Sequence, residues 1–238
     1  MGTIPTKDKM SNAAKAVNIE ATGIQNVVMN AKKDLTKDQL NVIEALHTEF
    51  LNAESQEDKI EAAKSMASKW YEVGSPIVSG YFAEEIANMQ NTQDSWSIAG
   101  TTYQLGMQKA DSKKELQFAK GRAIRAFENA ISLADDNISD KINLALIYVD
   151  YPEAGPMQGI QMLLKLNENN PDNVQVMNQL ARLAIRTQQT DKAIGRLEKA
   201  LSIEPENNTS VCLIAQAYAQ AGKDDLAKEF QNKCEKTN

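Results

Sequence analysis

Hydrophobic residues recur at spacings of three and four along most of the chain, a pattern typical of amphipathic helices. The clearest example lies between residues 174 and 207, where the polar stretch Gln188-Gln189-Thr190 separates two apolar stripes. We therefore predict two antiparallel helices joined by a short turn, with Asp172 as N-cap of the first and Gln175 as its capping-box partner. The stripes are Met177, Leu180, Ala181 and Ala184, then Ala193, Ile194, Leu197, Ala200 and Leu201.

The same pattern returns 34 residues later. Small residues recur where the two helices of a pair approach closely, because Ala or Gly lets the backbones pack. This spacing resembles the tetratricopeptide repeat, which implies an all-α, right-handed α-solenoid of helix-turn-helix units. The matching positions of the second copy are Val211, Ile214, Ala215, Tyr218, Gly222, Ala227 and Cys234.

Earlier copies are less regular. The first-helix signature of the family is matched by Trp96, Ala99, Gly100 and Tyr103, but its second-helix signature, Ala123, Phe127 and Ala130, comes eleven residues late. Eleven residues are about three helical turns, so both helices can keep their facing. Ser112 with Glu115 resembles a capping box and divides the added length between the two helices.

The whole array is predicted to be one unpaired helix and five helix pairs. The unpaired helix covers Thr36–Ala53, with Thr36 and Gln39 as its capping box, and it covers the start of the stack. We predict a flexible arm over residues 1–33 and a single superhelical domain over 34–238. The repeats lie near 60–92, 93–137 with the insertion, 138–173, 174–207 and 208–238.

Composition and charge exclude several function classes. The formal net charge of −6 provides no basic excess for nucleic-acid binding. The longest apolar runs, such as Ile142–Val149, are too short to span a bilayer. Met1–Thr6 lacks the basic-then-apolar layout of a leader, which slightly favours the cytoplasm; a periplasmic or secreted location would follow if a leader had been removed. Cys212 and Cys234 are interpreted as small core residues, with one disulfide as the alternative.

No catalytic site, metal site or cofactor is expected. The single histidine, His47, has Glu44 three residues before it, but a di-iron site would need a second such motif. Adjacent acidic residues point about 100° apart on a helix, so Glu84-Glu85 and Asp224-Asp225 are interpreted as solvated surface charges. No glycine-rich phosphate loop is present.

The family resemblance implies that the first helix of each pair lines a concave groove. Amide and guanidinium groups there could bind an extended segment of a partner, with Arg182 and Arg186 holding an acidic group. Ordinary solvated polar residues are the alternative interpretation. The predicted groove residues are Asn143, Gln175, Asn178, Gln179, Arg182, Arg186, Gln216 and Gln220, and the pair starting at Gln93 adds Ser97, Thr101 and Gln104.

The predicted function is a non-enzymatic scaffold that binds a protein partner in this groove. The alternative is a structural subunit, or a self-assembling homo-oligomer, that uses the convex face or the ends of the array. Apolar residues exposed on the last helix would favour the alternative.

Overall fold

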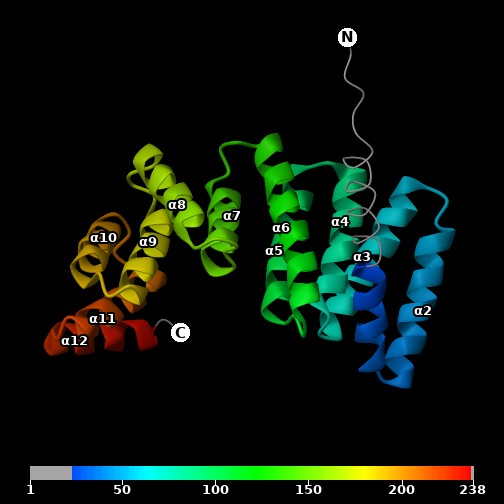
Figure 1. Cartoon of the computed structure of the whole chain (residues 1–238), viewed down its shortest axis with the longest axis horizontal. Helices are drawn as coiled ribbons and strands as arrows, with labels where there is room; N and C mark the ends of the chain where they lie inside the picture. The colour runs from blue at the N-terminus through cyan, green and yellow to red at the C-terminus, as the bar shows by residue number, and fades with distance from the viewer. Residues whose placement is uncertain (1–22, 237–238) are drawn as a thin grey trace, which may run out of the picture. The chain divides into compact units, whose positions relative to one another are not determined.

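The computed structural model describes residues 23–236, and no strand occurs among them (Figure 1). The chain divides into two compact units, Met1–Ile147 and Tyr148–Asn238, and each is described by itself. A helix over 23–33 is followed by α2 (Lys37–Asn52), α3 (Gln56–Glu72), α4 (Pro76–Gln90), α5 (Gln93–Gln108), α6 (Lys113–Leu133), α7 (Ile138–Asp150), α8 (Met157–Asn169), α9 (Val174–Arg186), α10 (Thr190–Ile203), α11 (Asn208–Gln220) and α12 (Asp224–Lys236).

Side-chain caps fix where several helices begin. Thr36 and Gln39 form the predicted reciprocal capping box of α2. The predicted cap of α9 is wrong, because Asn173, not Asp172, accepts the N–H of Val176 at 3.0 Å. Asp172 instead forms an ion pair with Lys199 at 3.0 Å.

The eleven-residue insertion is distributed along the pair α5–α6. α5 has 16 residues and α6 has 21, whereas α9 and α10 have 13 and 14. Three of the added residues therefore lie in α5, seven in α6 and one in the turn. Ser112 caps α6 by accepting the N–H of Glu115, whose carboxylate accepts the N–H of Asp111 rather than that of Ser112.

Glycines let the long helices of the first unit approach each other. A Cβ placed on Gly80 of α4 would lie 2.8 Å from the Tyr103 ring, and one on Gly100 of α5 would lie 2.8 Å from the Phe127 ring. Tyr103 and Phe127 are completely buried in these interfaces. The glycine of the predicted first-helix signature therefore marks the site where an aromatic ring of the next helix packs.

A buried charge cluster joins α4, α5 and α6. Glu84 is only 5% exposed, so its interpretation as a surface charge is wrong. Its carboxylate accepts the Tyr103 hydroxyl at 2.7 Å and the Arg122 guanidinium at 2.8 Å. Burial, and then the neighbouring Glu84 carboxylate, raise the pKa of Tyr103 well above its usual value.

The helix over residues 23–33 corrects part of the expected flexible arm. Val27 is 6% exposed, and a Cβ on Gly23 would lie 2.9 Å from the Phe118 ring. This segment is therefore packed into the first unit. The remainder of the expected arm, residues 1–22, lies outside the described residues.

Candidate interaction surfaces

The predicted groove residues of α9 share one helix face but differ in exposure. Gln175, Gln179, Arg182 and Arg186 follow one another at spacings of three and four, which places them on the same side of α9. Gln175 and both arginines are exposed. Gln179 is half-buried, and its side-chain carbonyl oxygen is buried without a hydrogen-bond donor.

Two predicted contact residues of the second unit already have internal partners. The Arg186 guanidinium donates to the Asp150 carboxylate at 2.8 Å. Gln220 is exposed, yet its amide N–H donates to the carbonyl of Ile185 at 3.2 Å and its amide oxygen accepts the Thr190 hydroxyl at 3.1 Å. A partner that binds Arg186 or Gln220 would have to compete with these contacts. Gln216, on α11, is also exposed.

Asn178 is not available for an extended ligand. It is 3% exposed, and its amide N–H donates to the Asn207 side chain at 3.2 Å while its oxygen accepts the Ser210 hydroxyl at 2.8 Å. Asn207 is the N-cap of α11. The Asn178 side chain therefore joins α9 to the start of the next repeat.

The first unit uses predicted groove residues in a similar way. Ser97 on α5 donates its hydroxyl to the carboxylate of Asp140, which is buried at the start of α7. The amide of Gln93 donates to the other oxygen of Asp140 at 2.6 Å. Asn143 is another predicted groove residue of this unit, and it is half-buried on α7.

An apolar groove in the first unit was not predicted. It has a volume of about 570 Å³ and lies between α3 and α5, with α4 contributing to its lining. Tyr71 of α3 and Ile98 of α5 are 57% and 61% exposed, and the two side chains line the same groove. The lining residues of this α3–α5 groove are Lys64, Ala67, Ser68, Tyr71, Ser79, Ala83, Ile86, Gln90, Thr92, Asp94, Ser95, Ile98 and Thr102.

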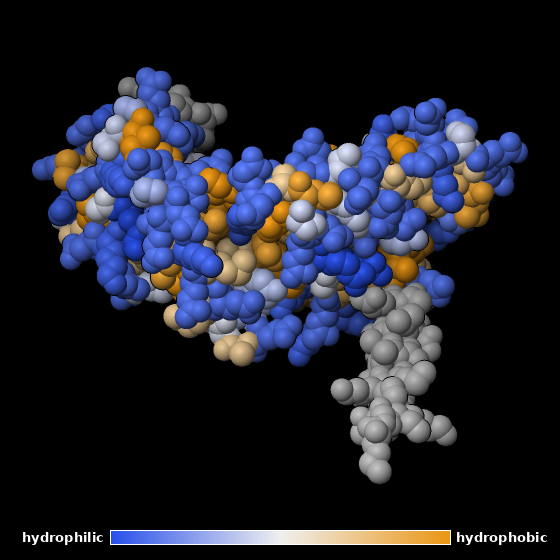
Figure 2. Space-filling view, turned by 90° about the horizontal axis from the view of Figure 1, so that it is seen from above, coloured by the Kyte–Doolittle hydropathy of each residue, from blue (hydrophilic) through white to orange (hydrophobic). Residues whose placement is uncertain are grey.

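The signal for the α3–α5 groove was present in the sequence. Tyr71 and Ile98 occupy first-helix positions of the kind that the family resemblance assigns to the concave face. The predicted contact set contains only polar residues at such positions, because only those carry hydrogen-bonding groups for an extended segment. Figure 2 shows hydrophobic residues interspersed among hydrophilic ones on the displayed surface. The spacing of hydrophobic residues along the sequence does not tell which of them are exposed in this way.

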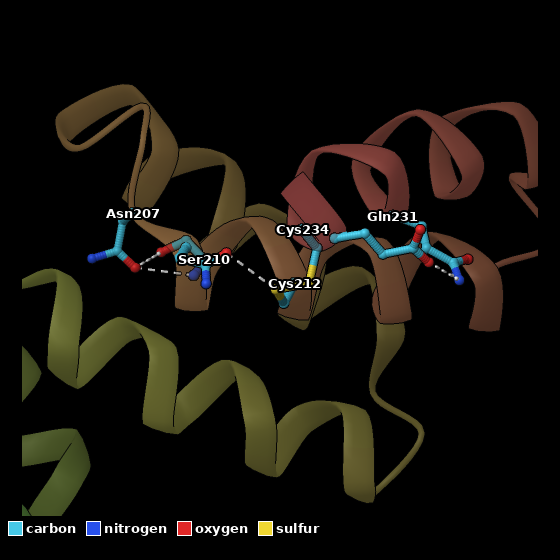
Figure 3. The surroundings of a disulfide bond; sticks show 7 residues. Asn207, Ser210, Cys212, Gln231 and Cys234 are labelled. Carbon is cyan, nitrogen blue, oxygen red and sulfur yellow. Dashed lines mark hydrogen bonds between the residues drawn. A yellow bond between two sulfur atoms is a disulfide. The ribbon is translucent and has the colours of Figure 1, made fainter. Parts of the chain in front are cut away.

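Cys212 and Cys234 form a disulfide that joins α11 to α12 (Figure 3). The alternative of one disulfide is therefore found, in place of the interpretation as small core residues. Their Cα atoms are 5.0 Å apart, within the range that a disulfide spans. Both cysteines are half-buried, so the bond lies at the edge of the helix pair instead of in its core.

Within residues 23–236, no group of three or more His, Cys, Asp or Glu side chains could hold a metal ion. Over the same residues, no helix is both long and apolar enough to span a membrane.

Comparison with known proteins identifies the repeat. The family model described as tetratricopeptide repeat matches residues 174–207 and 209–238. No curated protein matches the chain. Among solved structures, the C-terminal part of a TPR repeat-containing protein from Cytophaga hutchinsonii is 15% identical, with 89% of this chain and 77% of that one covered and a TM-score of 0.53. MamA (41-end) from Desulfovibrio magneticus RS-1 is 14% identical, with 76% and 96% covered and a TM-score of 0.50.

At these identities the structural likeness establishes the fold alone. Together with the all-helical structure, it confirms the predicted α-solenoid of tetratricopeptide-type repeats. Such arrays are generally scaffolds for protein interactions.

Proposed function

We propose that this chain, a tetratricopeptide-repeat protein, is a non-enzymatic scaffold that binds an extended segment of a partner protein in its α3–α5 groove. The observation that carries the proposal is the pair of large apolar side chains, Tyr71 and Ile98, which stand exposed on α3 and α5 of one groove. An exposed apolar cluster with a polar rim is the usual composition of a protein-binding surface.

The chemistry of the groove specifies the partner segment. Tyr71 and Ile98 would bury one or two aliphatic or aromatic side chains of the partner, because aromatic anchors supply most of the binding energy at such sites. Ser68 and Gln90 supply donors and acceptors for an extended backbone. The Thr102 hydroxyl donates to the Ile98 carbonyl at 2.7 Å and so supplies an acceptor. Lys64 and Asp94 put opposite charges on the lining, so no strong net charge of the partner is required.

The α9–α11 face is the second candidate surface for the same function. Arg182 is exposed on α9, and Gln216 is exposed on α11. Arg182 would hold an acidic group of a partner, while Arg186 is already compensated by Asp150.

Affinity capture of partners from the native organism tests the proposal. The double variant Tyr71→Ala/Ile98→Ala should lose the partners that wild type retains, and Leu51→Ala/Leu133→Ala is the matched control because it removes two exposed apolar side chains outside the groove. Loss of the same partners in Arg182→Ala/Arg186→Ala alone would move the site to the α9–α11 face. Equal capture by all variants would contradict both surfaces.

A structural or self-assembling role is the alternative function. The observation in its favour is Leu226, an exposed large apolar residue on the last helix, with the half-buried Phe230 one turn later. Light scattering over a range of concentrations separates the two functions. Self-assembly through α12 would be supported if the molar mass of wild type rises with concentration while that of Leu226→Glu stays at the value of the monomer.

A further inference from the structure

The first unit contains a second pocket, formed by the helix over 23–33 together with α2, α3 and α4. Its volume is about 460 Å³, within the range of roughly 300–1,000 Å³ that small-molecule sites occupy. None of its lining residues belongs to the α3–α5 groove. We call it the N-terminal pocket; it is lined by Ile24, Gln25, Val28, Met29, Lys32, Ile43, His47, Met66, Trp70, Tyr81 and Phe82.

Most of the lining is apolar. Ile43, Met66, Trp70 and Phe82 are buried core residues, and the helix over 23–33 adds three more hydrophobic side chains. A pocket with such walls favours an apolar occupant over ordered water, because water needs several polar partners to be held.

Several polar side chains of the pocket can donate a hydrogen bond to an oxygen acceptor. Trp70 is only 1% exposed, and its indole N–H is buried without a hydrogen-bond acceptor. The indole nitrogen has no exposed surface, so Trp70 contributes its ring to the apolar wall of the pocket. Lys32 and His47 also line the pocket, and no lining residue is acidic.

The existing contact of Lys32 leaves it able to bind a ligand. Its ammonium group lies 3.7 Å from the carboxylate of Glu44, and both side chains are partly exposed. Pairs of this kind are weak in water, so a carboxylate with a desolvated apolar body can compete for Lys32.

We propose that the N-terminal pocket binds a small apolar carboxylate, such as a medium-chain fatty acid. The hydrocarbon chain fills the space among Val28, Ile43 and Phe82. The carboxylate lies at the Lys32 and His47 end of the lining and accepts hydrogen bonds from their side chains, since an ionised carboxylate is purely an acceptor. This site is separate from the proposed protein-binding surfaces and stands or falls without them.

Tryptophan fluorescence provides a direct test, because the chain has two tryptophans and only Trp70 lines the pocket. The probe is 11-bromoundecanoate, whose bromine quenches a nearby indole. In Trp96→Phe, where Trp70 is the sole reporter, we expect saturable quenching. In Trp70→Phe, where Trp96 remains, quenching should not exceed that caused by sodium bromide. Equal quenching of both tryptophans, or none, overturns the proposal.

Matched variants then test the pocket and the head group, with affinities from calorimetry and folding checked by circular dichroism. Val28→Phe should fill the pocket and weaken binding at least tenfold, whereas Val42→Phe, on an exposed residue outside it, should change nothing. Lys32→Glu should weaken binding of the carboxylate about tenfold but not that of 11-bromoundecanol; Lys33→Glu makes the same charge change outside the lining. Equal affinities across each pair would refute the site.

Discussion

Removing the Cys212–Cys234 disulfide should release the last helix while leaving the rest of the chain folded. Apart from Ala227, which is buried, and Phe230 and Cys234, which are half-buried, the described side chains of α12 are exposed. The Tyr218 and Phe230 rings pack 5.7 Å apart, and this is the principal aromatic contact between α11 and α12. Ala227 and Phe230 are the α12 side chains in the apolar core that α12 shares with α11, so little buried apolar area stabilises α12.

The size of the effect follows from the loop that the disulfide closes. With a sequence separation of 22, the bond lowers the entropy of the unfolded chain by about 11 cal/mol/K, which is roughly 3 kcal/mol at 25 °C. Since every 1.4 kcal/mol is a factor of ten, the opening equilibrium of α12 should rise by about 100-fold.

Hydrogen exchange followed by mass spectrometry measures this equilibrium helix by helix. In wild type treated with a reducing agent, and in Cys212→Ser/Cys234→Ser without it, amides of α12 should exchange about 100-fold faster. Those of α3–α6 should be unchanged, and the reducing agent should have no further effect on the double variant. Unchanged exchange of α12, or two free thiols in unreduced protein, would refute the reasoning.

Three further outcomes test the packing. Gly100→Ala brings a methyl carbon 2.8 Å from the Phe127 ring, so urea unfolding should show a loss of about 1–3 kcal/mol. Asn178→Ala removes the hydrogen bonds that Asn178 makes with Asn207 and Ser210, while the Ser210 hydroxyl keeps its bond to Asn207. At about 0.5–1.5 kcal/mol for each bond lost, the same assay should show a loss of about 1–3 kcal/mol, whereas a solvated groove residue would cost almost nothing. Burial and a hydrogen bond to Glu198 raise the pKa of Tyr218 to about 12. The folded protein therefore holds this proton more tightly than the unfolded chain, so the stability contributed by Tyr218 should be lost as pH rises from 10 to 12. Glu198→Gln should lower the pKa of Tyr218, measured by ultraviolet absorbance.

Local features of the sequence predicted the fold well. The three-and-four periodicity and the caps locate helices because both act within one or two turns of chain. Thr36 with Gln39 needs no tertiary contact to form its capping box. The cap of α9 was misplaced by one residue because Asp172 and Asn173 are both good N-caps, and local propensity does not choose between them.

The candidate sites were harder to predict because exposure is a tertiary property. Glu84 is charged and adjacent to another acidic residue, so only its contacts with Tyr103 and Arg122, 19 and 38 residues away, reveal that it is buried. The two cysteines are likewise 22 residues apart, and that separation alone does not show whether their Cα atoms approach to 5.0 Å.

The polar residues at predicted groove positions explain why apolar side chains become the main candidates for partner contact. Ser97 is bonded to Asp140, Asn178 to Ser210, and Arg186 to Asp150, so each of these three side chains already has an intramolecular partner. Breaking such a bond to bind a ligand returns little net free energy, since one hydrogen bond replaces another. Exposed apolar groups have no such competitor, and burying them against a partner is favourable in proportion to the area removed from water. Contact with a partner therefore yields a larger net binding free energy at Tyr71 and Ile98 than at the amides and arginines that the family resemblance indicates.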